Sequence, residues 1–218
     1  MIRLFAKGWA LWRAAFLAFA ASLALAGCAA NTSPTDSSPD EIQRAVYRHD
    51  GPPALTLFTM VSNRSGAGAH TSLMVNASQR VIFDPAGSVR HSAVPESGDV
   101  LYGITPRIEA FYESAHARAT YHVIVQQIEV SPAVAEQALR LVQDNGAVGQ
   151  TFCTQSTSSI LRKLPGFEDM PATFFPLKLS QSFAKLPGVT SRTIYENDSD
   201  DKQLAIEAFT VAPPAADS

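Results

Sequence analysis

The sequence predicts an α+β fold in which an antiparallel sheet packs against helices. Strand-like runs dominate the first part of the chain and helical patterns the second. The strands also follow one another without the repeated strand–helix–strand units of a parallel sheet. Hydrophobic residues make up 46% of the 218 residues, which is enough for one packed core. We therefore expect a single domain over residues 42–211 and a disordered tail over 212–218.

Four strands are predicted in the first part of the domain. Residues 54–62 form an apolar run rich in β-formers, which stops where Asn63 and the following glycines permit a turn. Residues 70–75 and 80–84 are separated by the letters NASQ and predict a hairpin, because Asn and Ser favour tight turns. Residues 99–104, DVLYGI, predict another short strand.

Helical patterns follow these strands. Thr105 and Pro106 are a suitable cap and first residue for a helix over 106–117. Thr151 or one of its neighbours is the expected cap of a later helix, which carries Cys153. The other expected elements are a strand over 119–130, a helix over 133–145 that follows Ser131 and Pro132 and stops at Gly146, a short helix around 177–186 and a strand over 189–196.

The N-terminus has the features of an export signal in their usual order. Basic residues precede a short apolar run over 14–26, and Leu-Ala-Gly-Cys follows at once and ends at Cys28. These last four residues resemble a bacterial lipobox, in which the Cys is acylated on sulfur and becomes the new N-terminus. The alternatives are an ordinary signal peptide cut slightly earlier and an uncleaved anchor, although the run is shorter than the roughly 20 residues that span a bilayer. We expect a signal peptide over 1–27.

A lipid on Cys28 would attach the protein to a membrane. The polar stretch over 28–41 is then a flexible tether between the lipid and the folded domain. Ala29 rather than Asp follows the Cys, which by resemblance to enterobacterial sorting favours the outer membrane. We expect a lipid-anchored protein of the bacterial cell envelope that faces the periplasm.

Composition excludes several classes of function. The formal net charge is −3 and no stripe of Lys and Arg is present, so we expect no nucleic-acid partner. The sequence contains no Gly-rich phosphate loop and neither a CxxC nor an HExxH motif. We therefore expect neither a metal nor a cofactor.

Cys153 is the first candidate for chemistry. Once Cys28 is acylated, the chain holds no other Cys with which Cys153 could form a disulfide. The expected position at the start of a helix favours the thiolate, because the unpaired N–H groups and the helix dipole lower the pKa of the thiol. The alternative is a small, buried hydrophobic residue without a chemical role.

His70 is the best candidate for a base that activates this thiol. It begins the first strand of the predicted hairpin, and counting back through the turn places it opposite residues 84 and 85, so Asp84 can accept its second ring N–H. The alternative for this pair is a surface His beside a turn-forming Asp. His122 is a rival base, although its strand position favours a hydrogen-bonded core residue. We expect the other three histidines, His49, His91 and His116, to be solvated.

These residues together resemble a circularly permuted NlpC/P60 domain, a papain-like group that includes lecithin:retinol acyltransferase-like and YiiX-like proteins. The resemblance covers roughly residues 54–164: a His that opens a strand, a polar residue on the next strand, and much later a Cys at a helix start in TFCTQSTSSILRKL. It implies that Cys153 is the nucleophile, His70 the base and Asp84 the third polar residue. One departure is GDVLYG, residues 98–103, which is similar to a strand that usually precedes the His strand but here follows it.

The expected activity is hydrolysis of an amide in peptidoglycan peptides, or of a related acyl bond, through an acyl-enzyme. Helix N–H groups would stabilise the oxyanion, with Gln150, Gln155 or His122 as auxiliary groups. The alternative is a non-catalytic envelope lipoprotein whose cleft binds a peptide or glycan and in which Cys153 is a buried structural residue.

Overall fold

The computed structural model describes residues 36–87 and 89–209. These residues belong to one unit, Ser33–Ser218. The expected signal peptide, Cys28 and the tail over 212–218 lie outside the described residues. Within the described ranges, no helix is both long enough and apolar enough to cross a membrane.

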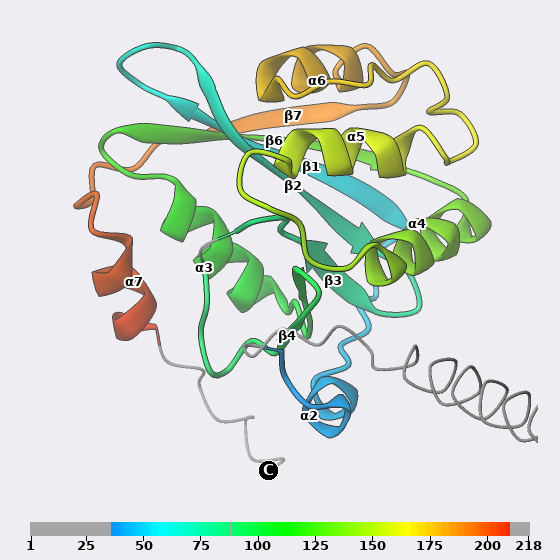
Figure 1. The fold of residues 1–218 in the computed structure, drawn as a ribbon, viewed down its shortest axis with the longest axis horizontal. Helices are drawn as coiled ribbons and strands as arrows, with labels where there is room; N and C mark the ends of the chain where they lie inside the picture. Colours follow the sequence, from blue (N-terminus) through cyan, green and yellow to red (C-terminus); the bar gives the residue numbers. More distant parts are fainter. Residues whose placement is uncertain (1–35, 88, 210–218) are drawn as a thin grey trace, which may run out of the picture. The chain divides into compact units, whose positions relative to one another are not determined.

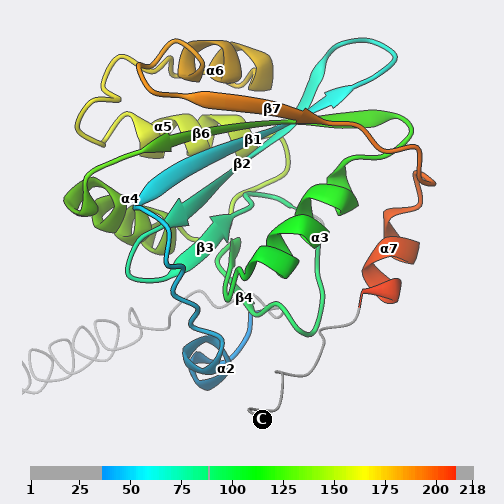
Figure 2. The same cartoon turned by 180° about the vertical axis from the view of Figure 1, so that it is seen from behind.

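One antiparallel sheet of seven strands forms the centre of the domain, in the order β4-β5-β3-β2-β1-β6-β7 (Figures 1 and 2). Its middle consists of β1 (Ala54–Ser62), paired with β2 (Gly68–Asn76) on one side and with β6 (Tyr121–Glu129) on the other. The remaining strands are β3 (Arg80–Phe83), β4 (Glu96–Ser97), β5 (Val100–Leu101) and β7 (Thr190–Ile194). The predicted α+β class with an antiparallel sheet is confirmed.

Helices cover both faces of this sheet (Figures 1 and 2). One face is covered by α3 (Pro106–His116), and the opposite face by α4 (Pro132–Asn145), α5 (Cys153–Leu161) and α6 (Pro176–Phe183). Two apolar cores follow from this arrangement, one on each side of the sheet. Leu57 belongs to the core beneath α4–α6 and its neighbour Phe58 to the core beneath α3, as the alternation of side chains along a strand requires.

The same alternation decides where the residues at the start of β2 point. His70 pairs with Met60, which belongs to the core on the α3 side, so His70 also points toward α3. Thr71 points the other way, toward α5, where its Oγ1 lies 3.1 Å from Oγ1 of Thr154. Successive residues of one strand therefore contact helices on opposite faces of the sheet.

The first half of β2 lacks a neighbour on its outer side, because β3 is much shorter than β2. The described pairs run only from Leu73 with Phe83 to Asn76 with Arg80. The chain leaves the sheet at Asp84, and the edge of β2 around His70 remains open to other parts of the chain. This open edge is where the start of α5 can approach His70.

Helix starts agree with the sequence in two cases and differ in a third. Thr105 and Ser131 cap α3 and α4 with their side chains, and each helix has Pro in its first turn. Thr151 or one of its neighbours was expected to cap α5: the neighbouring Phe152 is the N-cap, but no side chain makes a capping hydrogen bond. Thr151 instead has φ of 81° and lies in the left-handed region, where its hydroxyl cannot serve as an ordinary cap.

The start and the end of the described chain are more ordered than the sequence indicated. Residues 36–41, assigned to the flexible tether, include the start of α2 (Pro39–Arg44), which Ser38 and Glu41 close with a capping box. Ser37 also donates its backbone N–H to the carbonyl of Glu96 at 2.7 Å. A last helix that the sequence did not reveal, α7 (Lys202–Ala208), follows β7 and packs against α3.

Candidate functional site

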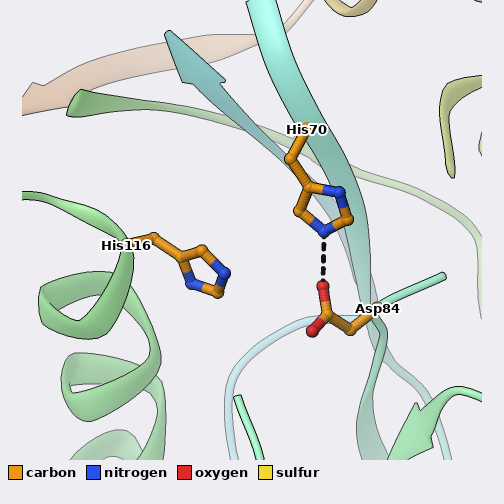
Figure 3. A group of neighbouring side chains, drawn as sticks. All are labelled: His70, Asp84 and His116. Atoms are coloured by element: carbon orange, nitrogen blue, oxygen red, sulfur yellow. Dashed lines mark hydrogen bonds and ion pairs between the residues drawn. The ribbon is translucent and has the colours of Figure 1, made fainter. Parts of the chain in front are cut away.

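The structure brings His70 and Asp84 together. Nε2 of His70 lies 2.7 Å from Oδ1 of Asp84, and Figure 3 shows the ring directed at the carboxylate. The predicted contact is therefore present, although the register behind it is wrong. The observed pairing of Leu73 with Phe83 puts Asp84 level with Ser72, and the Asp84 side chain reaches His70 from just beyond the end of β3.

Tyr112 of α3 fixes the carboxylate of Asp84 from the other side. Its hydroxyl lies 2.7 Å from Oδ1 of Asp84 and 2.7 Å from Oγ of Ser72. A phenol has a single proton, so donation to the carboxylate leaves Ser72 as the donor to Tyr112. Asp84 is 4% exposed, and these partners satisfy a charge that would otherwise be costly to bury.

The pair of His70 and Asp84 favours its charged form. Burial alone would raise the pKa of Asp84, but the hydrogen bond and the charge of His70 outweigh burial and lower this pKa to about 2. Burial would likewise lower the pKa of His70, whereas the hydrogen bond and charge of Asp84 raise it to about 9. His70 is therefore an imidazolium at neutral pH, with Nε2 engaged by Asp84 and Nδ1 left for another partner.

Cys153 lies close enough to His70 for the two side chains to interact by hydrogen bonding and by charge. It is the first residue of α5, it is 8% exposed, and it approaches the open edge of β2. Burial raises the pKa of the thiol, but hydrogen bonding to His70 and the charge of His70 lower it by more, so that the pKa lies below its ordinary value. Thr154 and the backbone of Thr71 act in the same direction as His70. A cysteine whose pKa is lowered by an adjacent imidazolium is the arrangement of an activated thiol.

His116 is not solvated, which corrects the expectation from the sequence. It is 6% exposed, its ring stacks near that of His70 with centroids 6.0 Å apart, and its Nδ1 lies 2.9 Å from the carbonyl oxygen of Tyr112. Burial lowers the pKa of His116 to about 3, and the charge of Lys202 acts in the same direction. The ring is therefore neutral at pH 7 and donates Nδ1–H to the carbonyl.

His70, Asp84 and His116 each place one possible metal-ligand atom within 4.8 Å of the others (Figure 3). Two of these groups, however, are already hydrogen-bonded to each other at 2.7 Å. A metal would have to replace that hydrogen bond and displace the proton of His70. We therefore assign the three side chains to a hydrogen-bonding and proton-holding role.

The neutral, buried state of His116 predicts how stability depends on pH. The pKa of His116 rises from about 3 in the folded protein to 6.5 when the chain unfolds, so the unfolded state binds the extra proton and stability falls as pH drops from 6.5 toward 3. In His116→Phe this contribution is absent, and we expect the variant to lose less stability than the wild type, by on the order of 2 kcal/mol, between pH 6.5 and pH 4. Urea unfolding at several pH values measures the difference, and parallel curves for the two proteins would contradict the assignment.

Asp99 connects the two loops that deliver Asp84 and Cys153. Its Oδ2 accepts the backbone N–H of Ala86 at 2.9 Å and that of Val148 at 2.8 Å, and its carbonyl accepts the N–H of Asp84 at 2.8 Å. One buried side chain therefore sets the position of the loop after Asp84 relative to the segment before Cys153. From the sequence, Asp99 was evident only as part of GDVLYG, because a carboxylate with partners this far apart in the chain leaves no local pattern.

Backbone strain is concentrated in these two loops and at Asp99. Among the described residues, the non-glycine positions with positive φ are Ala86 at 57°, Asp99 at 64° and Thr151 at 81°. Ala86 and Thr151 each lie two positions from a residue of the candidate site, and Asp99 contacts both loops. Such conformations cost on the order of 1 kcal/mol each and persist where the surrounding structure fixes them.

Removing the carboxylate of Asp99 should loosen the site without removing any of its reacting groups. We expect Asp99→Ala to slow alkylation of Cys153 several-fold and to shift the alkylation midpoint to higher pH, because His70 and the thiol are no longer held together. Asp99→Asn keeps an oxygen that can accept both N–H groups and should restore most of the reactivity. A loss of thermal stability in Asp99→Ala with an unchanged pH midpoint would mean that Asp99 is only structural.

The auxiliary residues expected from the sequence make no hydrogen bond to Cys153, His70 or Asp84 among the described residues, and their role in stabilising an oxyanion stays a prediction. Gln150 is exposed, and among the described residues no hydrogen bond joins Gln150 or Gln155 to Cys153. His122 is only partly buried rather than a core residue, and its Nδ1 lies 2.6 Å from Oδ1 of Asn63. It points to the face of the sheet opposite to that of His70, because it pairs with Val61, whereas His70 pairs with the preceding residue of β1, Met60.

Three comparisons place this geometry against known proteins. Searches of protein-family models, of curated proteins and of solved structures returned no match. The chemistry of the site must therefore be argued from its own contacts.

Proposed function

We propose that the protein is a cysteine hydrolase or acyltransferase in which Cys153 is the nucleophile, His70 the general acid and base, and Asp84 the group that orients His70. The observation that carries this proposal is the imidazole of His70, which interacts with both Asp84 and Cys153. Its Nε2 bonds to the buried carboxylate of Asp84 at 2.7 Å, and its charge helps to lower the pKa of the Cys153 thiol. A structural cysteine requires neither feature.

The reaction begins with the thiolate of Cys153, which the positive charge of His70 favours. The sulfur attacks the carbonyl carbon of an amide or ester, and the electron pair of the C=O bond moves to the oxygen. The backbone N–H groups at the start of α5 can stabilise this oxyanion, because no side chain caps the helix there. Collapse of the intermediate expels the amine or alcohol, which takes the proton from His70, and leaves a thioester on Cys153.

The second half of the reaction restores the enzyme. His70, now neutral, removes a proton from water or from another acceptor, whose oxygen attacks the thioester carbon. The acyl group leaves as an acid or as the transferred ester, and the proton on His70 again pairs with the thiolate of Cys153. Asp84 keeps Nε2 of His70 protonated throughout, which leaves Nδ1 as the atom that exchanges the proton.

We place this activity in the bacterial cell envelope, on a protein anchored through a lipid on Cys28. The lipobox-like residues that end at Cys28 support the anchor, and the substrate that fits an envelope location is a peptide amide of peptidoglycan or a related acyl bond. The resemblance to permuted NlpC/P60 domains supports the same substrate class, since the residues that carry it are the ones that meet in the site.

The reactivity of Cys153 toward iodoacetamide tests the proposal. The label is measured by mass spectrometry on the peptide that contains Cys153, so the full chain can be used and the state of Cys28 does not interfere. We expect alkylation of the native protein with a midpoint below the ordinary thiol value of about 8.5. Alkylation that occurs only after unfolding would contradict the proposal and favour a binding protein with a buried structural thiol.

A further inference from the structure

A cavity of about 310 Å³ is lined by both His70 and His116. This volume lies at the lower end of the range for small-molecule sites and suits a group the size of one amino-acid residue. Three further lining residues carry charge, namely Arg118, Asp200 and Lys202. Since the mechanism above uses only His70 from this set, the other charged side chains need an explanation.

Arg118 is the least satisfied of these side chains. Its side chain is 7% exposed, and neither Nε nor Nη2 has a hydrogen-bond partner among the described residues. Its remaining contact joins Nη1 to Oδ2 of Asp198 at 3.5 Å, which is longer than a strong charge-assisted bond, and Asp198 itself is largely exposed. A buried guanidinium with this little compensation is costly, and an anion that enters the adjacent cavity would reduce that cost.

The charges around the cavity favour a monoanion. Lys202 adds a second positive charge, and its pKa is lowered by burial and by the charge of Arg118, against the effect of Asp84. Asp200 contributes the opposing negative charge, and its Oδ1 accepts the N–H and the hydroxyl of Thr120 at 2.9 and 2.7 Å. The charge of His70 is already matched by Asp84, so two cations, Arg118 and Lys202, face one anion, Asp200, among the remaining lining residues. Asp198, which pairs with Arg118 at 3.5 Å, lies outside the lining and is largely exposed, so solvent screens its charge.

We propose that this cavity binds a carboxylate on the leaving-group side of the substrate. The assignment to this side follows from His70, which lines the cavity and which, in the proposed function on which this inference rests, protonates the leaving group. Arg118 acts through its charge, because its Nε and Nη2 atoms are out of contact with solvent. The substrate is therefore an acyl derivative of an amine that carries its own carboxylate, such as a peptide bond to a C-terminal amino acid.

An equilibrium experiment tests the cavity without using the thiol. Full-length protein with Cys153→Ser is unfolded thermally in the presence of N-acetyl-β-alanine or N-acetylglycine, and of the neutral amide of each, at constant ionic strength. We expect at least one acid at ten or more times its Kd to raise Tm by a few degrees, and the amides to have no such effect. Acids and amides that behave alike would overturn the proposal.

Matched variants assign the effect to Arg118. Arg118→Gln should abolish the shift, whereas Arg162→Gln, which removes the same charge from an exposed position after α5, should leave it unchanged. If Arg118→Gln does not fold, Lys202→Gln removes the second cation of the cavity and should weaken binding several-fold. An unchanged shift after the removal of either cation would overturn the proposal.

A second experiment, on the alkylation rate of Cys153, tests whether the cavity lies on the leaving-group side of the thiol. The rate of alkylation of Cys153 by N-iodoacetyl-β-alanine is divided by the rate with the neutral amide of this reagent, and the same ratio is measured for free glutathione. We expect the ratio for Cys153 to be at least several times the ratio for glutathione. Arg118→Gln should remove this preference. Slow reaction with every reagent, iodoacetamide included, would count against the proposed hydrolase, while the equilibrium experiment would still decide the anion site. Normal reaction with iodoacetamide but no preference for the acid would overturn the leaving-group assignment alone.

Discussion

His70→Ala is expected to abolish the thiolate character of Cys153 at neutral pH. Burial raises the pKa of the thiol, and the largest opposing influence in the wild type is His70, so its removal should leave the pKa at or above the ordinary value. At pH 6.5 the thiolate fraction of an ordinary cysteine is about one per cent, so we expect at least a tenfold slower alkylation by iodoacetamide than in the wild type. Hydrolysis of any substrate should fall further, because the proton donor for the leaving group is lost as well.

The matched control for this variant is His122→Ala. His122 is the other base that the sequence allowed, and it points to the opposite face of the sheet, where it contacts Asn63. We expect its removal to leave both the rate and the pH midpoint of alkylation unchanged. A loss of reactivity in His122→Ala, or full reactivity in His70→Ala, would show that the base has been assigned to the wrong histidine.

Asp84→Asn should have an effect of similar size for a different reason. Without the carboxylate, burial of His70 is opposed only by the smaller influence of Cys153, so we expect the pKa of His70 to fall from about 9 and His70 to be neutral at pH 7. The amide can also present its NH₂ group to Nε2 and favour the wrong tautomer, an effect that costs up to about 10⁴ in turnover where a carboxylate orients a catalytic His. We expect the alkylation midpoint of Cys153 to move upward and turnover to fall by at least about a hundredfold.

Two other variants distinguish the loss of the Asp84 charge from a non-specific effect of substitution on the fold. Asp144→Asn makes the same chemical change on an exposed residue of α4 and should have no effect. Tyr112→Phe removes one of the two hydrogen bonds to the carboxylate while the ring keeps its place, so we expect a smaller shift in the same direction. An alkylation midpoint that does not move in Asp84→Asn, with the fold intact by circular dichroism, would contradict the role of Asp84.

The parts of the site that could be predicted are those that depend on local pattern. The alternation of β2 and the turn between β2 and β3 bring His70 near Asp84 even with the register misplaced, because the two residues are only 14 apart in the chain. The helix that begins at Cys153 was also visible as a change from irregular to periodic sequence. The α+β class followed from the order of these same elements.

The remaining parts depend on packing between distant segments. Tyr112 and His116 lie in a helical pattern in which an apolar face is evident, but nothing in that pattern shows that the face ends against Asp84. A His at a helix end is usually solvated, and here the approach of β2 and α7 buries it. Asp99 contacts residues 13 and 49 positions away, which no periodicity reveals. Short helices such as α7 give too few residues for a pattern to emerge.

The large difference in sequence separation within the site has a consequence for folding. The contact of His70 with Asp84 closes a loop of 14 residues, whereas the hydroxyl groups of Thr71 and Thr154, which join β2 to the helix of Cys153, are separated by 83 residues. The entropy of loop closure grows with loop length, so the hairpin can form its acid–base pair early, before α5 has docked. During folding we therefore expect the thiol to stay an ordinary, weakly nucleophilic cysteine until α5 docks against β2.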